Sequence, residues 1–491
     1  MKLWTNGFFH TMENEQKTYR QLATDQGLIL GFDDEVNHYS FDEIIDLKGA
    51  HVYPGFVDAH MHIVGYGRLL NHINLSSCKT KEDVINIIKS SFKQEPLILE
   101  GYAECGLTKE DLNRISKDIP ILLGHHDYHS ITCNDAVLSK VGLLHTNGVL
   151  TEEEATRAEE SFPPYSKEQI ENMMTDAIKS LYRFGITGAH SDDLAYFNGY
   201  QETLSAFENV LKKHPFRAHL LMHHLILDDY IQSKRPFLDN SPYLQLGAIK
   251  MFYDGTLSSK TAYMKTTYKG TDSHGLKIQS DEQFEEMIKK CRRYDLPVAV
   301  HIIGDQGTID VARLLQKYPP KKGLHDRLIH TPWLDDEGIS LMQKIDVVLD
   351  IQPQFLSTDL PWALTYLETP PKYIFPWKTL MKAGLIQAGS SDAPVEIPNP
   401  LLGIYAAIFR KSDHDHQVYQ EGEKLSYFDA ISLYTKGANY PTYHQNRGFL
   451  KKGYIADFSM FTKNLFSLSE NEFKTDLVYM TVVDEHIVYK K

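Results

Sequence analysis

Eight short apolar segments separated by helix-like stretches constrain the fold of this chain more than any other feature. Alternation of buried strands with helices is typical of a parallel sheet with crossover helices. Eight such strands are the number that closes the sheet into a TIM (β/α)8 barrel. We therefore predict an α/β protein built on this barrel, with strands at residues 56–60, 186–190, 217–222, 248–252, 298–302, 327–330, 347–351 and 386–388.

The 491 residues exceed what a barrel requires, and the excess predicts two further units. Strand-like runs at both ends of the chain indicate one β-sandwich-like subdomain, formed by residues 1–53 and 440–491. Residues 70–180 are too many for one crossover helix, and they mix helix-like with strand-like runs. We interpret them as a subdomain inserted after the first barrel strand and lying over the barrel mouth. The barrel then comprises residues 54–69 and 181–439.

Charge and the lack of targeting signals narrow the class of protein. A formal net charge of -14 disfavours a nucleic-acid or anionic-membrane partner, because both surfaces are negative. The first residues show no basic-then-apolar signal, and no apolar stretch is long enough to span a bilayer. The four cysteines form no C-x-x-C pair and fit a reducing compartment. We expect a cytoplasmic protein without a nucleic-acid or membrane partner.

Histidine and aspartate residues stand at the ends of several predicted strands. His60 and His62 alternate along the first strand, so both side chains point to one face and each offers a ring nitrogen. A His-x-His pair by itself, or His301 or His330 alone, is more often structural than metal-binding. Asp392 follows the last strand, and the carboxyl ends of barrel strands line the active site. Together the five residues predict a metal site at that end of the barrel.

Five segments of the chain resemble the amidohydrolase superfamily, in the branch that includes N-substituted formamide deformylases. The resemblance extends over nearly the whole chain and includes the long insertion after the first strand. Two positions depart from it, because Ile329 stands where relatives often carry glutamate and Lys260 where they often carry arginine. The matching segments are residues 54–62, 247–257, 300–305, 389–395 and 448–458.

This resemblance implies a metal centre that includes a lysine. Lys250 would be carboxylated and would bridge two divalent ions, since a buried lysine near cations loses its proton readily. The alternatives are a lysine in a structural ion pair, or a site with one ion and an unmodified lysine. Zinc is the first expectation for a histidine-rich site. The implied ligands are His60, His62, Lys250, His301, His330 and Asp392.

The ligand set also predicts the reaction. A divalent metal lowers the pKa of a bound water towards about 7 and polarises a carbonyl group. Asp392 would accept the proton of that water as a general base and deliver it to the leaving nitrogen as a general acid. We therefore predict hydrolysis of an amide-type C–N bond, other than a peptide bond, in a small molecule. The resemblance implies an N-substituted formamide as the substrate.

Alternatives stay open for the edge of the pocket and for the function. By resemblance, His129 matches a substrate-pocket histidine; the alternative is that it lies on the surface of an ordinary loop. Tyr102 and Trp333 are candidates for an apolar pocket wall, although core packing is the more common role of a single aromatic residue. The other functions considered are a cyclic amidase of the hydantoinase or imidazolonepropionase type and a barrel binding protein that has lost catalysis. A homodimer is also expected from the resemblance.

Overall fold

A computed structural model describes residues 1–126, 129–239 and 241–491, and its centre is an eight-stranded parallel sheet. The strands lie side by side in the order in which they occur in the chain. After the last strand, the N–H of Asp392 donates to the His60 carbonyl at 2.9 Å, which closes the sheet. The predicted TIM barrel is therefore confirmed. Its strands are β8 (Phe56–Met61), β14 (Ile186–Ser191), β15 (Arg217–His223), β16 (Leu244–Phe252), β17 (Val298–Ile302), β18 (Asp326–His330), β20 (Val347–Ile351) and β22 (Ile386–Gly389).

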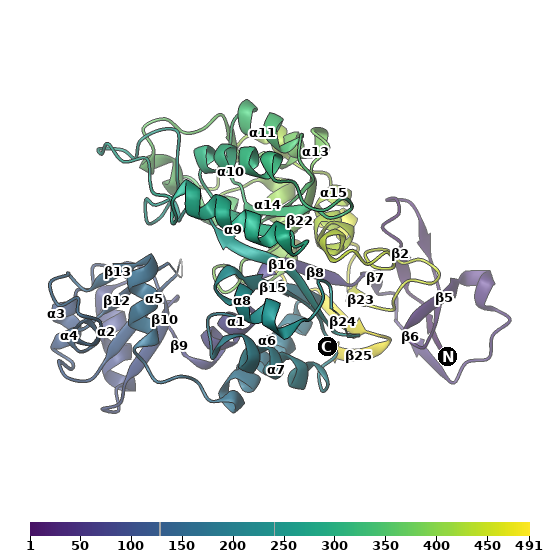
Figure 1. The fold of residues 1–491 in the computed structure, drawn as a ribbon. Coiled ribbons are helices and arrows are strands. Elements are labelled where there is room, and N and C mark those ends of the chain that lie inside the picture. The colour runs from purple at the N-terminus through teal and green to yellow at the C-terminus, as the bar shows by residue number, and fades with distance from the viewer. Residues whose placement is uncertain (127–128, 240) are drawn as a thin grey trace.

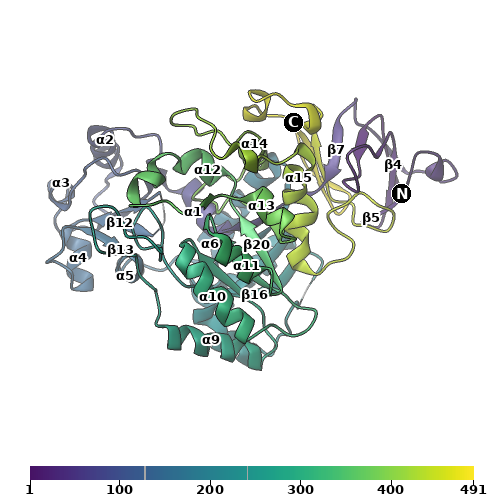
Figure 2. The ribbon, with the colours of Figure 1, turned by 90° about the horizontal axis from the view of Figure 1, so that it is seen from above.

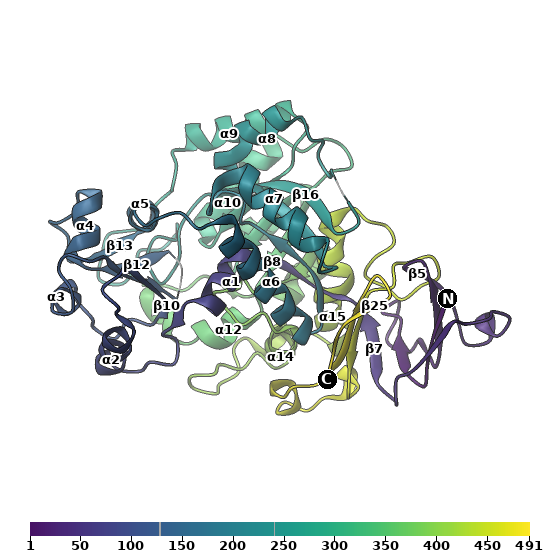
Figure 3. The same cartoon turned by 90° about the horizontal axis from the view of Figure 1, so that it is seen from below.

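The barrel strands are apolar because both of their faces are covered. Every residue of β15 and of β17 is buried, as expected for parallel strands beneath a layer of helices. Figures 2 and 3 together show these helices around the sheet. They are α1 (Ile63–Asn71), α6 (Lys167–Arg183), α7 (Gly199–Leu211), α8 (Leu227–Ser233), α9 (Asp281–Arg293), α10 (Asp305–Lys317), α11 (Asp336–Met342), α12 (Gln354–Asp359), α13 (Trp377–Lys382), α14 (Pro400–Phe409) and α15 (Tyr427–Ser432).

Helix α6 shows how the sequence determines one of these elements. Ser166 caps its first turn, accepting from the Gln169 N–H at 3.2 Å while the Gln169 side chain accepts from the Ser166 N–H. The buried residues recur at helical spacing, so one face packs against the barrel. These residues are Ile170, Met173, Met174, Ala177, Ile178, Leu181 and Tyr182.

The two ends of the chain form a β subdomain of two sheets. The larger sheet joins them, because β7 (His51–Pro54) pairs with β23 (Phe458–Phe461). Trp4, Phe458 and Met480 belong to the apolar core of this subdomain. The first sheet has the order β5 (Leu28–Phe32), β4 (Leu22–Asp25), β1 (Lys2–Thr5) and β6 (Glu43–Asp46). The second has the order β25 (His486–Lys490), β24 (Val478–Val483), β23, β7, β2 (Phe8–His10) and β3 (Thr18–Tyr19).

The insertion between β8 and β14 has a sheet and core of its own. Figures 1 and 3 show it on the side of the barrel opposite to the β subdomain. No helix in the described ranges is long and apolar enough to cross a membrane. The sheet has the order β13 (Val149–Thr151), β12 (Ser130–Cys133), β11 (Ile121–His125), β10 (Leu97–Tyr102) and β9 (Ile73–Asn74), and the helices are α2 (Lys81–Ser91), α3 (Lys109–Asn113), α4 (Asp135–Val141) and α5 (Glu152–Glu160).

Candidate metal site

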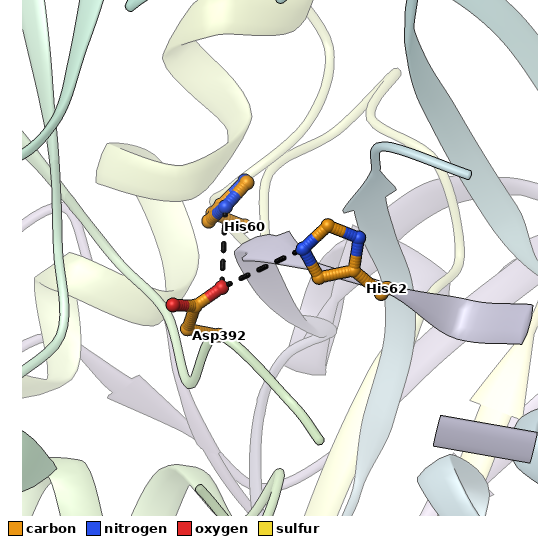
Figure 4. A group of neighbouring side chains, drawn as sticks. All are labelled: His60, His62 and Asp392. Carbon is orange, nitrogen blue, oxygen red and sulfur yellow. Dashed lines mark ion pairs between the residues drawn. The ribbon is translucent and has the colours of Figure 1, made fainter. Parts of the chain in front are cut away.

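Three of the predicted ligands lie together where β8 and β22 end. His60 Nε2 is 3.2 Å from Asp392 Oδ1, and His62 Nε2 is 3.8 Å from the same oxygen (Figure 4). One possible ligand atom from each residue lies within 4.8 Å of the others. Two imidazole nitrogens and a carboxylate oxygen are a donor set that zinc and similar divalent ions accept.

The backbone around this cluster is held in an uncommon conformation. The carboxylate of Asp58 accepts from Ser391 Oγ at 2.6 Å and from the His60 N–H at 3.1 Å, so it ties β8 to the segment after β22. Asp392 has a φ of 58° and His330 a φ of 79°, both in the left-handed region that side chains disfavour. Strained residues of this kind concentrate at functional sites. Two of the predicted ligands thus have this uncommon backbone conformation.

His301 and His330 face each other at the ends of β17 and β18. The Gln352 amide nitrogen donates to Ser390 Oγ, so its oxygen accepts from His330 Nδ1 at 2.7 Å. His301 Nε2 lies 3.3 Å from the carbonyl oxygen of Gly255, which can only accept. The two remaining nitrogens, His301 Nδ1 and His330 Nε2, are 3.0 Å apart, and in neutral rings both carry lone pairs. Facing lone pairs repel each other, and a bound cation removes that repulsion.

Burial keeps three histidines of the site, His60, His301 and His330, in their neutral form. It lowers the pKa of His330 to about 3, and it lowers the pKa of His60 and of His301 well below 6.5, with smaller effects from neighbouring charged groups. The neutral imidazole is the form that binds a metal. His330 Nδ1 also lies 4.0 Å from Asp392 Oδ2, which connects the two histidine pairs through one carboxylate.

Lys250 lies on β16 and pairs with a residue that the sequence did not single out. Its Nζ is 3.2 Å from Asp192 Oδ2, and the two side chains are 1% and 0% exposed. The backbone carbonyl of Asp192 accepts from His62 Nδ1 at 2.9 Å, so His62 Nε2 is the nitrogen that faces Asp392. The one sequence signal for Asp192 was its position at the carboxyl end of a barrel strand. Lys250 and Asp192 thus face each other as a buried pair.

The insertion brings His129 next to the barrel site. Its ring centroid is 5.5 Å from that of His301, and its Nδ1 lies 3.1 Å from Glu152 Oε2. Glu152 Oε1 accepts from Thr261 Oγ1 at 3.2 Å, and Gly255 leaves room for it, since a Cβ there would lie 2.7 Å from that oxygen. The sequence singled out His129 but not Glu152. Glu152 has a φ of 50°, which also lies in the left-handed region of the backbone. Residues 127 and 128 of the same segment lie outside the described residues.

The two aromatic residues expected at the pocket wall lie in apolar cores. Tyr102 is 1% exposed and belongs to the core of the insertion, where its hydroxyl accepts from the N–H groups of Cys105 and Leu107. Trp333 is 2% exposed and packs against Phe375 at a centroid distance of 5.8 Å. Within the described residues, no hydrogen bond or ring contact joins either of them to the metal cluster.

Comparison with known proteins assigns the family. The profile of the family described as "Amidohydrolase family" matches residues 43–489. The chain belongs to the amidohydrolase family. The YtcJ protein of Bacillus subtilis (strain 168) is 34% identical over 528 residues, covering 100% of this chain and 99% of its own. The Arabidopsis thaliana protein LONG AFTER FAR-RED 3 is 24% identical over 477 residues, covering 88% of this chain and 81% of its own. The superfamily expected from the sequence is confirmed, whereas the formamide deformylase branch stays a prediction.

Solved structures of amidohydrolase-type proteins share the fold. An uncharacterized metal-dependent hydrolase from Pyrococcus horikoshii OT3 superposes with a TM-score of 0.82 at 22% identity, covering 96% of this chain and 99% of that one. Atrazine chlorohydrolase TrzN from Arthrobacter aurescens TC1, complexed with zinc, superposes with a TM-score of 0.60 at 13% identity, covering 100% and 95%. At these identities the likeness concerns the barrel and its subdomain.

Proposed function

We propose that this amidohydrolase-family protein is a metal-dependent hydrolase that cleaves an amide-type C–N bond, other than a peptide bond, in a small molecule. The observation that carries the proposal is the donor set at the carboxyl ends of the barrel strands. His60, His62 and Asp392 offer ligand atoms within 4.8 Å of one another, and His301 and His330 turn two lone pairs towards each other. These neutral nitrogens and the carboxylate oxygen fit a divalent cation.

The metal ion and the residues around it would have different roles in the reaction. A bound divalent ion would supply Lewis acidity and lower the pKa of a water ligand. Asp392 has a carboxylate oxygen beside His60 and His62, so it can take a proton from the attacking water and pass it to the leaving nitrogen. Asp58 and the bonded ends of β8 and β22 hold Asp392 in place, which preorganises the proton transfer.

Lys250 determines how many ions the site holds in this proposal. If Lys250 were carboxylated, it would offer anionic oxygen ligands for a second ion, and its ion pair with Asp192 would be lost because two anions would then face each other. If Lys250 stays an amine, the ion pair persists and one ion is bound. Zinc is the proposed metal in either case, and metal content per chain together with the mass of the intact protein distinguishes the two states.

For the substrate we propose a small, weakly polar amide such as an N-substituted formamide. His129, placed beside His301 and bonded to Glu152, is the proposed substrate contact from the insertion. A cyclic amide is the second candidate. It is favoured by a 38% identity over 68 residues, 13% of this chain, to imidazolonepropionase of Acinetobacter baumannii.

A hydrolysis screen on metal-analysed protein tests the proposed function. N-formyl, N-acyl and cyclic amides are offered to the protein with zinc, and release of amine or ring opening is measured. Asp392→Asn should abolish turnover, whereas Asp336→Asn makes the same chemical change on an exposed surface pair with Lys372 and should have no effect. Turnover that persists after complete metal removal, or that is unchanged in Asp392→Asn, would refute the proposal.

A further inference from the structure

Tyr196 is an aromatic residue beside the candidate metal site that the proposed chemistry does not use. It lies between β14 and α7, on the face of the barrel where the strands end, and it is 45% exposed. Its ring centroid is 5.9 Å from that of His62 and 5.1 Å from that of His223, with the rings edge to face in both contacts. Tyr196 is therefore a partly exposed aromatic residue in contact with a predicted metal ligand.

The hydroxyl of Tyr196 is available as a hydrogen-bond donor. Within the described residues this hydroxyl makes no hydrogen bond. The backbone N–H of Tyr196 does make one, to the Asp193 carbonyl. A phenol left without a protein partner beside the reacting centre is suited to a bond with substrate.

A tyrosine hydroxyl keeps its proton at neutral pH, so Tyr196 is a hydrogen-bond donor and not a base. A neutral donor of this kind can stabilise an oxygen that becomes negative in the transition state.

We infer that Tyr196 is a further catalytic residue, whose hydroxyl donates a hydrogen bond to the substrate carbonyl oxygen as that oxygen becomes negative. The inference rests on the proposed amide hydrolysis. In that reaction the water oxygen bonds to the carbonyl carbon and the π electrons move onto the carbonyl oxygen. The C–N bond then breaks as they return, and the proton held by Asp392 goes to the leaving nitrogen. Tyr196 keeps its own proton throughout.

The size of the effect follows from the role. Removing one preorganised donor to a developing oxyanion lowers kcat by about 10²–10³-fold in enzymes where this has been measured. The bond strengthens only in the transition state, so KM should stay within about threefold. A residue that merely packed against His62 would instead change metal content or stability, because Phe preserves the ring.

The experiment compares Tyr196→Phe with Tyr200→Phe in the metal-loaded, full-length protein. Tyr200 lies on α7, and its hydroxyl bonds to Ser233 Oγ at 3.3 Å, so the control removes the same atom close by in the chain. We expect kcat on the best amide of the screen to fall at least 30-fold in Tyr196→Phe, with KM and zinc content unchanged, and to stay within twofold in Tyr200→Phe. Two outcomes overturn the inference: an active wild type with unchanged kcat in Tyr196→Phe, or a loss of kcat that tracks lost zinc. A wild type inactive on every amide refutes the proposed function and this inference with it.

Discussion

The ion pair between Arg217 and Asp457 makes a quantitative prediction about how the β subdomain is fixed to the barrel. Arg217 opens β15, and Asp457 directly precedes β23. Arg217 Nε and Nη2 each donate to one oxygen of Asp457 at 2.9 Å, and the two side chains are 7% and 6% exposed. Asp457 belongs to the segment of residues 448–458 that resembles the superfamily.

Removing either partner should lower the free energy of unfolding by about 3–5 kcal/mol, because a buried charge loses its counter-ion. Asp457→Asn should cost about 3 kcal/mol, since the amide still accepts one bond and Arg217 keeps Asp484 at 3.2 Å. Arg217→Met should lie at the upper end, because it leaves the Asp457 carboxylate buried with the Asp484 N–H as its remaining partner. The double variant should cost less than the two single variants together, by at least about 2 kcal/mol.

Urea unfolding followed by circular dichroism at 25 °C measures these differences, provided that the transition is a single cooperative step. Lys372→Met is the control, because it breaks an exposed pair with Asp336 and should cost less than about 1 kcal/mol. The reasoning is refuted if each single variant costs no more than this control. It is also refuted if the double variant costs the full sum, since the two groups would then not interact.

Three further predictions concern the metal site and the response to acid. Asp392→Asn should lower kcat by at least about 10²-fold without lowering the melting temperature. A variant that loses kcat and also melts at a lower temperature would show a structural role instead. Dialysis against a chelator should abolish hydrolysis, and zinc should restore it; activity that survives would exclude a metal at His60 and His62. Burial lowers the pKa of His10 from 6.5 to about 3, so the stability due to its neutral form is complete above pH 6.5 and is lost as the pH falls. Between pH 7.5 and 5.5 the wild type should therefore lose about 1.4 kcal/mol more than His10→Gln in urea unfolding, and identical losses would contradict the shift.

The barrel could be predicted from the sequence because its strands are buried on both faces. A strand such as β17 consists mainly of apolar residues, and the Val298–Ile302 bounds matched the prediction. The pairing of the short strand β7 cannot be predicted in the same way, because it is decided by contacts far along the chain. Met460 of β23, for example, pairs with Val52 of β7. Local pattern alone does not contain that information.

For the candidate site, the sequence located residues by their position at strand ends and failed where a role depends on contact across the barrel. His60, His62 and Asp392 follow apolar strands, and the structure brings them together. Asp192 pairs with Lys250, which lies 58 residues away in the chain. Glu152 pairs with His129, which lies 23 residues away. No spacing rule connects such pairs, so they emerge only when the fold is known.

The pairing of β7 with β23 also has a consequence for how the protein is made. The Phe56 N–H at the start of the strand that leads to His60 donates to Ser459 Oγ at 2.7 Å, across 403 residues of sequence. Until the ribosome has added Ser459, the strand that leads to His60 and His62 lacks this hydrogen-bond partner. A nascent chain therefore cannot complete the candidate site until Ser459 has been synthesised, and translation that stops before this residue should release protein in which the site is unfinished.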